Sequence, residues 1–156
     1  MKFPMTKEEY EMLKNELNRL KTTERKRVID AIAEARAHGD LSENAEYDAA
    51  KEEQGLLEAR IRELESKLAN AEIIEPQKVK SDKVSFGATV TVVDGDTGEE
   101  KVYKIVGEYI YDLEKGEIPY TSPIAQALIG HSAGDWVEVR TSQGIKEFEI
   151  VKVEYK

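Results

Sequence analysis

The sequence predicts an α+β protein whose N-terminal half is helical and whose C-terminal half is a small sheet. Apolar residues recur at alternating three- and four-residue steps from Tyr10 to Leu20 and again from Leu57 to Ala71, which is typical of a coiled-coil seam. After residue 83 the apolar period shortens toward two, which is typical of β-strands. We therefore expect an N-terminal antiparallel two-helix coiled-coil hairpin, followed by an antiparallel sheet with one short helix.

The first expected helix covers Lys7 to His38. Thr6 followed three residues later by Glu9 fits a capping box, in which the two residues satisfy free amides of the first turn. The apolar register is blurred between Thr22 and Arg27 and resumes at Val28. The pattern therefore predicts one long helix with an irregular middle.

The second expected helix covers Leu41 to Glu72. Only Gly39 and Asp40 separate it from the first helix, and glycine commonly ends a helix. So short a connection requires a tight reversal, which makes the two helices antiparallel. At about 1.5 Å per residue, each helix would be ~48 Å long.

The C-terminal half follows a linker. We expect a coiled-coil domain at 1–75, a linker at 76–83 and a second domain at 84–156. Two β-hairpins are expected in the second domain, with strands at 88–93 and 101–106 and at 136–140 and 145–153.

A short helix is expected between these hairpins, at 122–130. Ser122 is its expected N-cap, Pro123 occupies the first helical position and Gly130 ends it. Trp136, which begins a strand, is expected to lie in the core.

Composition limits the functions that the chain can have. It has 156 residues, a net charge of −9 and no cysteine, so disulfides and thiolate metal sites are excluded. Residues 1–80 carry 15 Lys/Arg against 18 Asp/Glu (net −3), and residues 81–156 carry 8 against 14 (net −6). This charge argues against binding of nucleic acid by electrostatics alone, so a nucleic-acid role would have to be local or organised by a partner. No apolar run is long enough for a bilayer, so we expect a cytoplasmic protein with no membrane partner.

Two carboxylates stand at the expected turn between the helices. Asp40 and Glu43 are three residues apart at a helix start, so their side chains can converge. Oxygen ligands of this kind suit Mg²⁺, but two exposed carboxylates bind it weakly, so a partner would have to complete the site. Alternatively, Asp40 caps the helix with Glu43 in its first turn, which stabilises a helix by about 1 kcal/mol. The residue types leave both interpretations open.

Other catalytic constellations are missing from the sequence. His38 and His131 are the only histidines and lie in different halves, so no triad or histidine metal site is expected. Tyr47 can stack on a nucleic-acid base or pack against the neighbouring helix. Lys21, Arg25, Lys26 and Arg27 form a basic cluster that is typical of a solvated helix face.

Three stretches of the chain resemble the bacterial Gre transcript cleavage factors. They are 31–36 leading into Gly39-Asp40-Leu41-Ser42-Glu43-Asn44-Ala45-Glu46-Tyr47, then Phe86-Gly87-Ala88-Thr89-Val90, and Ser122-Pro123-Ile124-Ala125-Gln126-Ala127-Leu128-Ile129-Gly130. The stretches occur in the family's order, and the resemblance extends over essentially the whole chain. It implies that the C-terminal domain is similar to the FK506-binding-protein fold.

The resemblance also implies a mechanism. In this family the C-terminal domain docks at the rim of the secondary channel of RNA polymerase, and the coiled coil enters the channel. The residues matching Asp40 and Glu43 then help to hold a second Mg²⁺, shared with the polymerase active site, and position a water. The polymerase cleaves backtracked nascent RNA near its 3′ end. The chain would thus be an accessory factor with no tightly bound cofactor, and not a free-standing nuclease.

Further roles are implied for individual residues. Tyr47, Arg36 and Lys51 would contact the RNA end, and 122–124 (Ser122, Pro123 and Ile124) would lie at the polymerase-docking surface. Pro119 departs from the family, which often has serine there, so the loop before the docking residues differs.

Alternative functions follow from the same features. One is a Gre-like protein that occupies the channel and inhibits the polymerase; such relatives have a more crowded acidic tip than the two acids at 39–43. Another is a coiled-coil adaptor or chaperone, which needs only the heptads. A third is a prolyl isomerase, suggested by the expected C-terminal fold, although the sequence indicates no aromatic-lined pocket.

Overall fold

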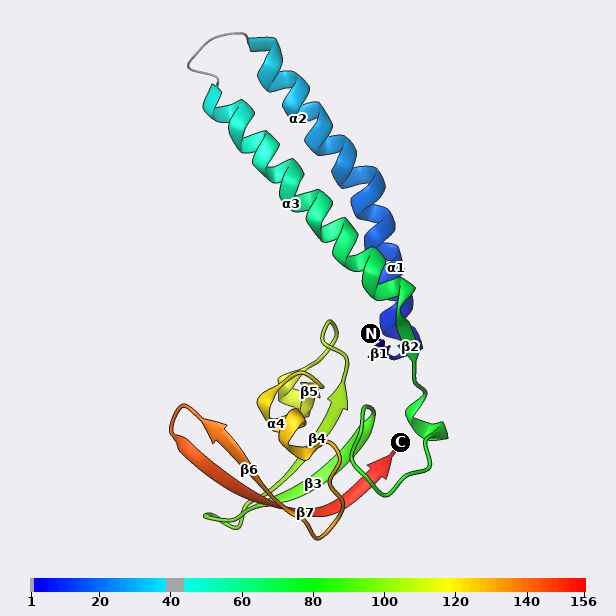
Figure 1. Cartoon of the computed structure of the whole chain (residues 1–156), viewed down its shortest axis with the longest axis vertical. Coiled ribbons are helices and arrows are strands. Elements are labelled where there is room, and N and C mark those ends of the chain that lie inside the picture. The colour runs from blue at the N-terminus through cyan, green and yellow to red at the C-terminus, as the bar shows by residue number, and fades with distance from the viewer. Residues whose placement is uncertain (1, 39–43) are drawn as a thin grey trace. The chain divides into compact units, whose positions relative to one another are not determined.

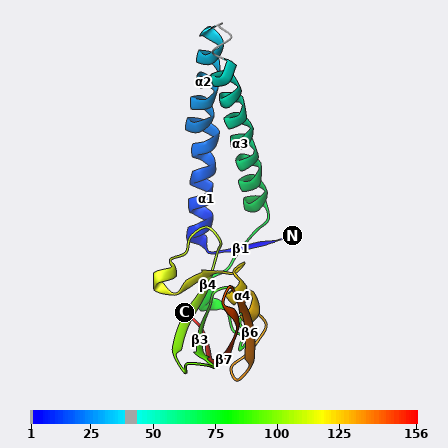
Figure 2. The same cartoon turned by 90° about the vertical axis from the view of Figure 1, so that its left-hand side faces the viewer.

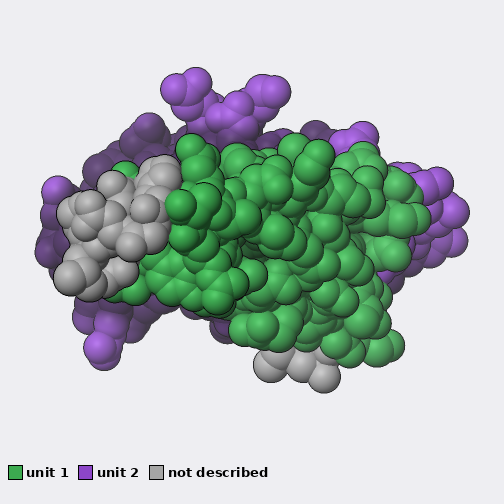
Figure 3. Space-filling view, turned by 90° about the horizontal axis from the view of Figure 1, so that it is seen from above, with its two compact units in different colours: residues 1–3, 10–71 green, residues 4–9, 72–156 purple. Residues whose placement is uncertain are grey.

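The structure is a computed structural model that describes the backbone of residues 2–38 and 44–156. It divides into two compact units: unit 1 comprises residues 1–3 and 10–71, and unit 2 comprises residues 4–9 and 72–156 (Figure 3). Unit 1 is helical and unit 2 contains a five-stranded sheet. The expected α+β class is confirmed.

The helices of unit 1 form the expected antiparallel hairpin (Figures 1 and 2). Its first arm consists of α1 (Lys7–Arg19), the π-helical turn η1 (Leu20–Glu24) and α2 (Arg25–His38). Its second arm is α3 (Asn44–Ala69). At the start of α1, the Glu9 N–H donates to Thr6 Oγ1 over 3.2 Å, which confirms the N-cap.

The π-helical turn explains the blurred apolar register. Leu13, Leu20, Val28 and Ala35 are all buried, and the step from Leu20 to Val28 is eight residues where the flanking steps are seven. In η1 the Arg25 N–H reaches back five residues to Leu20 O, so the turn accommodates one additional residue. η1 and α2 therefore both contact α3, where Ala50, Ile61 and Leu64 are buried.

The second arm is shorter than expected. α3 ends at Ala69, not at Glu72, because the chain turns at Asn70 and enters β2 (Ala71–Ile73). Asn70 O accepts the N–H of Phe3 over 2.9 Å, and β2 pairs with β1 (Phe3–Met5) in a two-stranded sheet. The inclusion of Ala71 in the coiled-coil seam was therefore wrong.

Unit 2 contains the sheet, in the order β5-β4-β3-β7-β6 (Figure 1). The two expected hairpins are confirmed as β3 (Ala88–Asp94) with β4 (Glu100–Val106), and β6 (Trp136–Thr141) with β7 (Gly144–Tyr155). β5 (Glu117–Pro119), which the sequence did not predict, pairs in parallel with β4. Short 3₁₀ turns occur at η3 (Pro76–Lys78) and η4 (Leu113–Lys115).

One face of the sheet packs against α4 (Pro123–Leu128), the expected short helix. Ala125 and Leu128 of α4 lie in the core with alternate strand residues, which are Ala88, Val90, Val92, Ile105, Val137, Val139, Phe148 and Ile150. Because strand residues alternate between faces, the residues between them point away from α4. The sheet therefore has one face covered by α4 and one outer face.

Trp136 lies on this outer face, so its expected place in the core was wrong. The side chain is 55% exposed. Its neighbour Val137 and the equivalent Val139 point into the core, which directs Trp136 outward. The ring lies over Gly95, where an added Cβ would be 3.1 Å from Trp136 Cζ3.

Among the described residues, no helix has the length and apolar character needed to cross a membrane.

Candidate functional site at the end of the helical hairpin

The acidic pair singled out by the sequence, Asp40 and Glu43, lies outside the described residues. The last described residue of α2 is His38 and the first of α3 is Asn44. These helix ends lie at the same end of the hairpin (Figure 1). The convergence of the two carboxylates therefore stays a prediction, as does the cap at Asp40.

Two of the residues expected to contact RNA lie against each other at this end. The Arg36 guanidinium carbon is 5.8 Å from the centroid of the Tyr47 ring, which is within the range of a cation–π interaction. Arg36 comes from α2 and is exposed, whereas Tyr47 comes from the first turns of α3 and is partly buried. Tyr47 thus packs against the neighbouring helix, while its stacking on a nucleic-acid base stays a prediction.

Lys51, the third of these residues, stands one helical turn after Tyr47. Residues four apart lie on the same face of a helix, so Lys51 extends the face that Tyr47 occupies. Its Nζ donates to Gln54 Oε1 over 3.0 Å, and its side chain is exposed. Arg36 therefore places one cation against the Tyr47 ring, and Lys51 lies one turn farther along the same face of α3.

A groove between α2 and α3 lies next to this face. It has a volume of about 370 Å³ and is lined by small residues and carboxylates, namely Ala31, Glu34, Ala35, Glu46, Ala49, Ala50 and Glu53. The groove is thus acidic.

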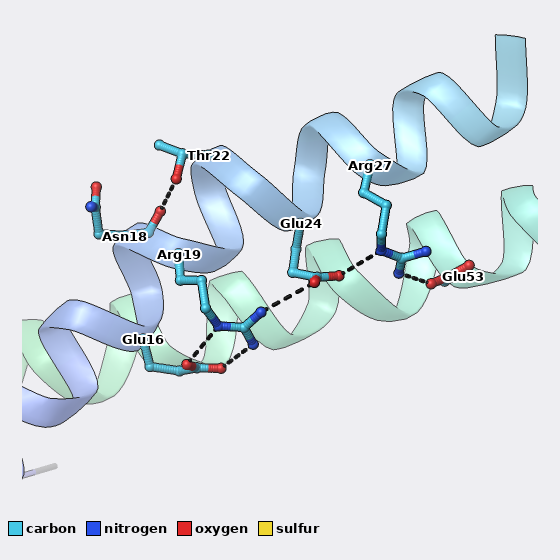
Figure 4. Close-up of polar contacts among 7 residues, drawn as sticks. All are labelled: Glu16, Asn18, Arg19, Thr22, Glu24, Arg27 and Glu53. Atoms are coloured by element: carbon cyan, nitrogen blue, oxygen red, sulfur yellow. Dashed lines mark hydrogen bonds and ion pairs between the residues drawn. The ribbon is translucent and has the colours of Figure 1, made fainter.

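Part of the basic cluster is engaged within the hairpin. Arg25 forms a two-point ion pair with Glu58 of α3, with N–O distances of 2.8 and 3.1 Å. Arg27 is bonded to Glu53 of α3 and, over 3.0 Å, to Glu24 (Figure 4). These arginines link the two arms, so they are less available for nucleic acid than their residue type suggested.

The same network continues along the first arm (Figure 4). Arg19 contacts Glu16 over 2.7 and 3.0 Å and Glu24 over 3.1 Å. The hydrogen bonds from Arg19 lower the pKa of Glu16. Thr22 Oγ1 also donates to Asn18 O over 2.8 Å. The π-helical turn is therefore surrounded by side-chain bonds. Each exposed pair contributes about 0–1 kcal/mol.

The expected docking residues lie at the start of α4 in unit 2. Ser122 Oγ accepts the Ala125 N–H over 3.2 Å, which confirms Ser122 as the N-cap. Pro123 is exposed, and Ile124 packs partly against the core. Ser122 and Ile124 thus hold α4 in place, and Pro123 is the member of the three that is open to solvent.

A second hollow lies in unit 2, with a volume of about 130 Å³. Among its described lining residues Phe86 is the only aromatic one, and the lining also includes Glu9, Lys104 and Glu117. Such a charged lining does not favour the binding of an apolar prolyl side chain.

Comparison with known proteins identifies the family. The family model described as the N-terminal domain of transcription elongation factors matches residues 3–73, and the GreA/GreB C-terminal model matches residues 78–155. This chain belongs to the GreA/GreB family of transcription elongation factors. The resemblance inferred from the three sequence stretches is confirmed.

Individual relatives in this GreA/GreB family match along the whole chain. Transcription elongation factor GreA of Rickettsia prowazekii (strain Madrid E) is 56% identical over 155 residues, covering 99% of this chain and 96% of the relative. GreA of Beijerinckia indica is 58% identical over 155 residues and covers 99% of both chains. The crystal structure of GreA factor homolog 1 (Gfh1) of Thermus thermophilus is 28% identical, has a TM-score of 0.47 and covers 99% of both chains.

The GreA relatives favour an elongation factor over the channel-occupying inhibitor and over the adaptor or chaperone.

Sequence reasoning missed the ion pairs that join the arms, from Arg25 to Glu58 and from Arg27 to Glu53. The sequence does contain these four residues, with two arginines on the first arm and two glutamates on the second. Pairing them requires knowledge of the register between the two arms, and the π-helical turn shifts that register by one residue.

Proposed function

We propose that this elongation factor binds RNA polymerase, inserts its helical hairpin into the secondary channel and stimulates cleavage of backtracked nascent RNA near its 3′ end. One observation carries the proposal: in a chain of the GreA/GreB family, the acidic pair at 40 and 43 falls between the two arms of a long helical hairpin.

The carboxylates of Asp40 and Glu43 would act on a Mg²⁺ ion shared with the polymerase. Their oxygen atoms fit this ion, which accepts one or two protein carboxylates and keeps several waters. Within the described part of the chain, no group of three or more His, Asp or Glu residues is arranged to hold a metal. When bound, the ion would activate water and stabilise the departing oxygen.

The chain would therefore be an accessory factor, and the cleavage activity would belong to the polymerase. Two carboxylates supply too few ligands and no general acid of their own. Asp40 and Glu43 would contribute charge and orient the attacking water, and the polymerase would supply the remaining ligands and the substrate.

The face around Tyr47 would contact the extruded RNA end. Arg36 and Lys51 supply two cations for the phosphate backbone, and the Tyr47 ring supplies a surface on which a base can stack. The contact between Arg36 and Tyr47 supports this role because it fixes the ring against α2. In an acidic chain, such a local cationic face attracts RNA without making the whole molecule a nucleic-acid-binding protein.

The start of α4 would dock on the rim of the polymerase channel. Pro123 is exposed and available for direct contact, whereas Ser122 and Ile124 would set the position of the helix that presents it. A change at Pro123 is therefore expected to affect docking more than it affects folding.

The proposal is tested by adding the chain to stalled, backtracked elongation complexes and measuring RNA shortening. Replacing Asp40 by Asn together with Glu43 by Gln should reduce the cleavage rate on the order of 10²-fold while polymerase binding, measured separately, persists. Asp48→Asn is the matched control because this exposed acid is also near the hairpin end. Unchanged cleavage by the double variant would refute the proposed role of the acidic pair.

A further inference from the structure

The outer face of the β6–β7 hairpin carries an exposed tryptophan among carboxylates. Val137, Val139 and Phe148 point into the core, so the residues between them point outward. We call these the β6–β7 outer face, which consists of Trp136, Glu138, Arg140, Ile145, Glu147 and Glu149. α4 covers the opposite face of the sheet, so this surface is separate from the proposed docking residues at 122–124.

Two large apolar side chains are exposed on this face. Trp136 is 55% exposed and Ile145 is 57% exposed. The Trp136 ring is seated on Gly95, whose missing side chain leaves room for it. The Gly95 N–H in turn donates to Glu147 O over 2.8 Å, which fixes this seat to β7. A tryptophan held at the surface in this way offers a large apolar contact to a partner, and tryptophan is enriched among the residues that dominate protein interfaces.

Within residues 2–38 and 44–156, the carboxylates on this face have no cationic partner. Glu138 lies directly opposite Glu147, and Glu149 lies directly opposite Trp136. Like charges at opposed positions destabilise a sheet, yet none of these three glutamates forms a side-chain hydrogen bond or ion pair with any residue that the structure describes. Arg140 lies on the same face without pairing to them.

We propose that the β6–β7 outer face binds an extended segment of a protein partner that presents lysine or arginine side chains between apolar ones. A cation above the Trp136 ring gains a cation–π interaction and is also close to the carboxylates of Glu138 and Glu149. Such a cation relieves the repulsion between Glu138 and Glu147. β6 is an edge strand that pairs only with β7 in the sheet, so an extended segment can lie alongside it.

The charge of this face argues against a second copy of the chain as its occupant. The β6–β7 outer face carries three carboxylates and one guanidinium, and the whole chain has a net charge of −9. Two such faces brought together would repel each other. A basic segment removes this repulsion, and an acidic or neutral segment does not.

The experiment uses the full-length chain, whose only tryptophan is Trp136, so its fluorescence reports on this face alone. The probe is the peptide acetyl-Lys-Val-Lys-Val-Lys-Val-amide, and the control peptide has Glu in place of each Lys. The basic peptide should shift the Trp136 emission to shorter wavelength in a saturable manner, and the acidic peptide should not. No shift with the basic peptide, or equal shifts with both, would overturn the proposal.

Two double variants test whether the carboxylates of the β6–β7 outer face bind the peptide. Glu138→Gln combined with Glu147→Gln should raise the dissociation constant of the basic peptide roughly fivefold. Glu99→Gln with Glu114→Gln changes the net charge equally at exposed positions elsewhere in unit 2 and should leave the constant unchanged. Equal weakening by both double variants would show binding by overall charge and contradict the proposal.

A control without peptide tests self-association. An emission shift of Trp136 that grows with protein concentration alone would also contradict the proposal, because a second copy would then cover the face. Polymerase is absent from every arm, so these outcomes are independent of the cleavage proposal.

Discussion

Deleting Thr23 tests whether the π-helical turn accommodates one additional residue. The deletion shortens the step from Leu20 to Val28 from eight residues to seven, which matches the flanking steps. The Arg25 N–H, now bonded to Leu20 O five residues back, would then reach the same oxygen by an ordinary α-helical bond. We therefore expect the stability of the hairpin to stay within about 1 kcal/mol of the wild type.

The matched control deletes Arg62 from α3, which contains no π-helical turn. Each residue advances an α-helix by about 100°, so this deletion rotates Leu64, which has no exposed surface, away from Ile61 and the core. The loss of leucine burial costs about 2–3 kcal/mol.

The assay is thermal unfolding of the full chain followed by helical circular dichroism. For a unit of this size, 1 kcal/mol shifts the melting temperature by ~4–8 °C. The Arg62 deletion should therefore lower it by roughly 10 °C or more, and the Thr23 deletion by much less. Equal losses in the two variants would refute the role assigned to the π-helical turn.

Three further results are expected. Leu64→Ala should destabilise the hairpin by about 2–5 kcal/mol in denaturant unfolding, because the side chain is fully buried; a loss below 1 kcal/mol would contradict the packing described. Ser122→Ala should destabilise unit 2 by about 1 kcal/mol through loss of the α4 cap, whereas Ser122→Asp should not. Asp94 accepts the N–H groups of Asp96 and Thr97 and lies near Lys146, which together lower its pKa. Its stabilisation is therefore complete above about pH 3.9, the unfolded value, and is lost as pH falls through the lower folded pKa. In urea unfolding between pH 5 and 2.5, Asp94→Asn should flatten the pH dependence, and an unchanged slope would contradict this assignment.

The regular elements could be predicted because their signals are local. The heptad steps gave both arms, and the turn residues between alternating strands gave both hairpins and α4. The end of α3 was misjudged because Ala71 continues the apolar pattern while the chain is in fact pairing with Phe3–Met5. That pairing joins segments about 70 residues apart, so no local pattern reports it.

The misplacement of Trp136 has a different cause. Residue type suggested burial, whereas the alternation with Val137 and Val139 already directed the side chain outward. The π-helical turn was visible only as a blurred register at 22–27, because a one-residue excess does not show how the backbone accommodates it. For Trp136, the position along the strand was thus more informative about burial than the hydrophobicity of the side chain.

The candidate site was predicted from residue chemistry and family resemblance together. The types and spacing of Asp40 and Glu43 suggested a shared Mg²⁺ site but did not distinguish it from a helix cap. The structure adds the contact between Arg36 and Tyr47, which requires the distance between two helices and so could not be read from either helix alone.

The dependence of RNA cleavage on Mg²⁺ concentration is the measurement that tests the shared metal site most directly. Stalled elongation complexes would be incubated with the wild-type chain, with Asp40→Asn or with the control Asp48→Asn over a range of Mg²⁺ concentrations. If Asp40 helps to hold the shared ion, Asp40→Asn should require more Mg²⁺ for half-maximal cleavage, and added Mg²⁺ should restore part of the rate. The same half-saturating Mg²⁺ for all three proteins would contradict a carboxylate ligand at this position.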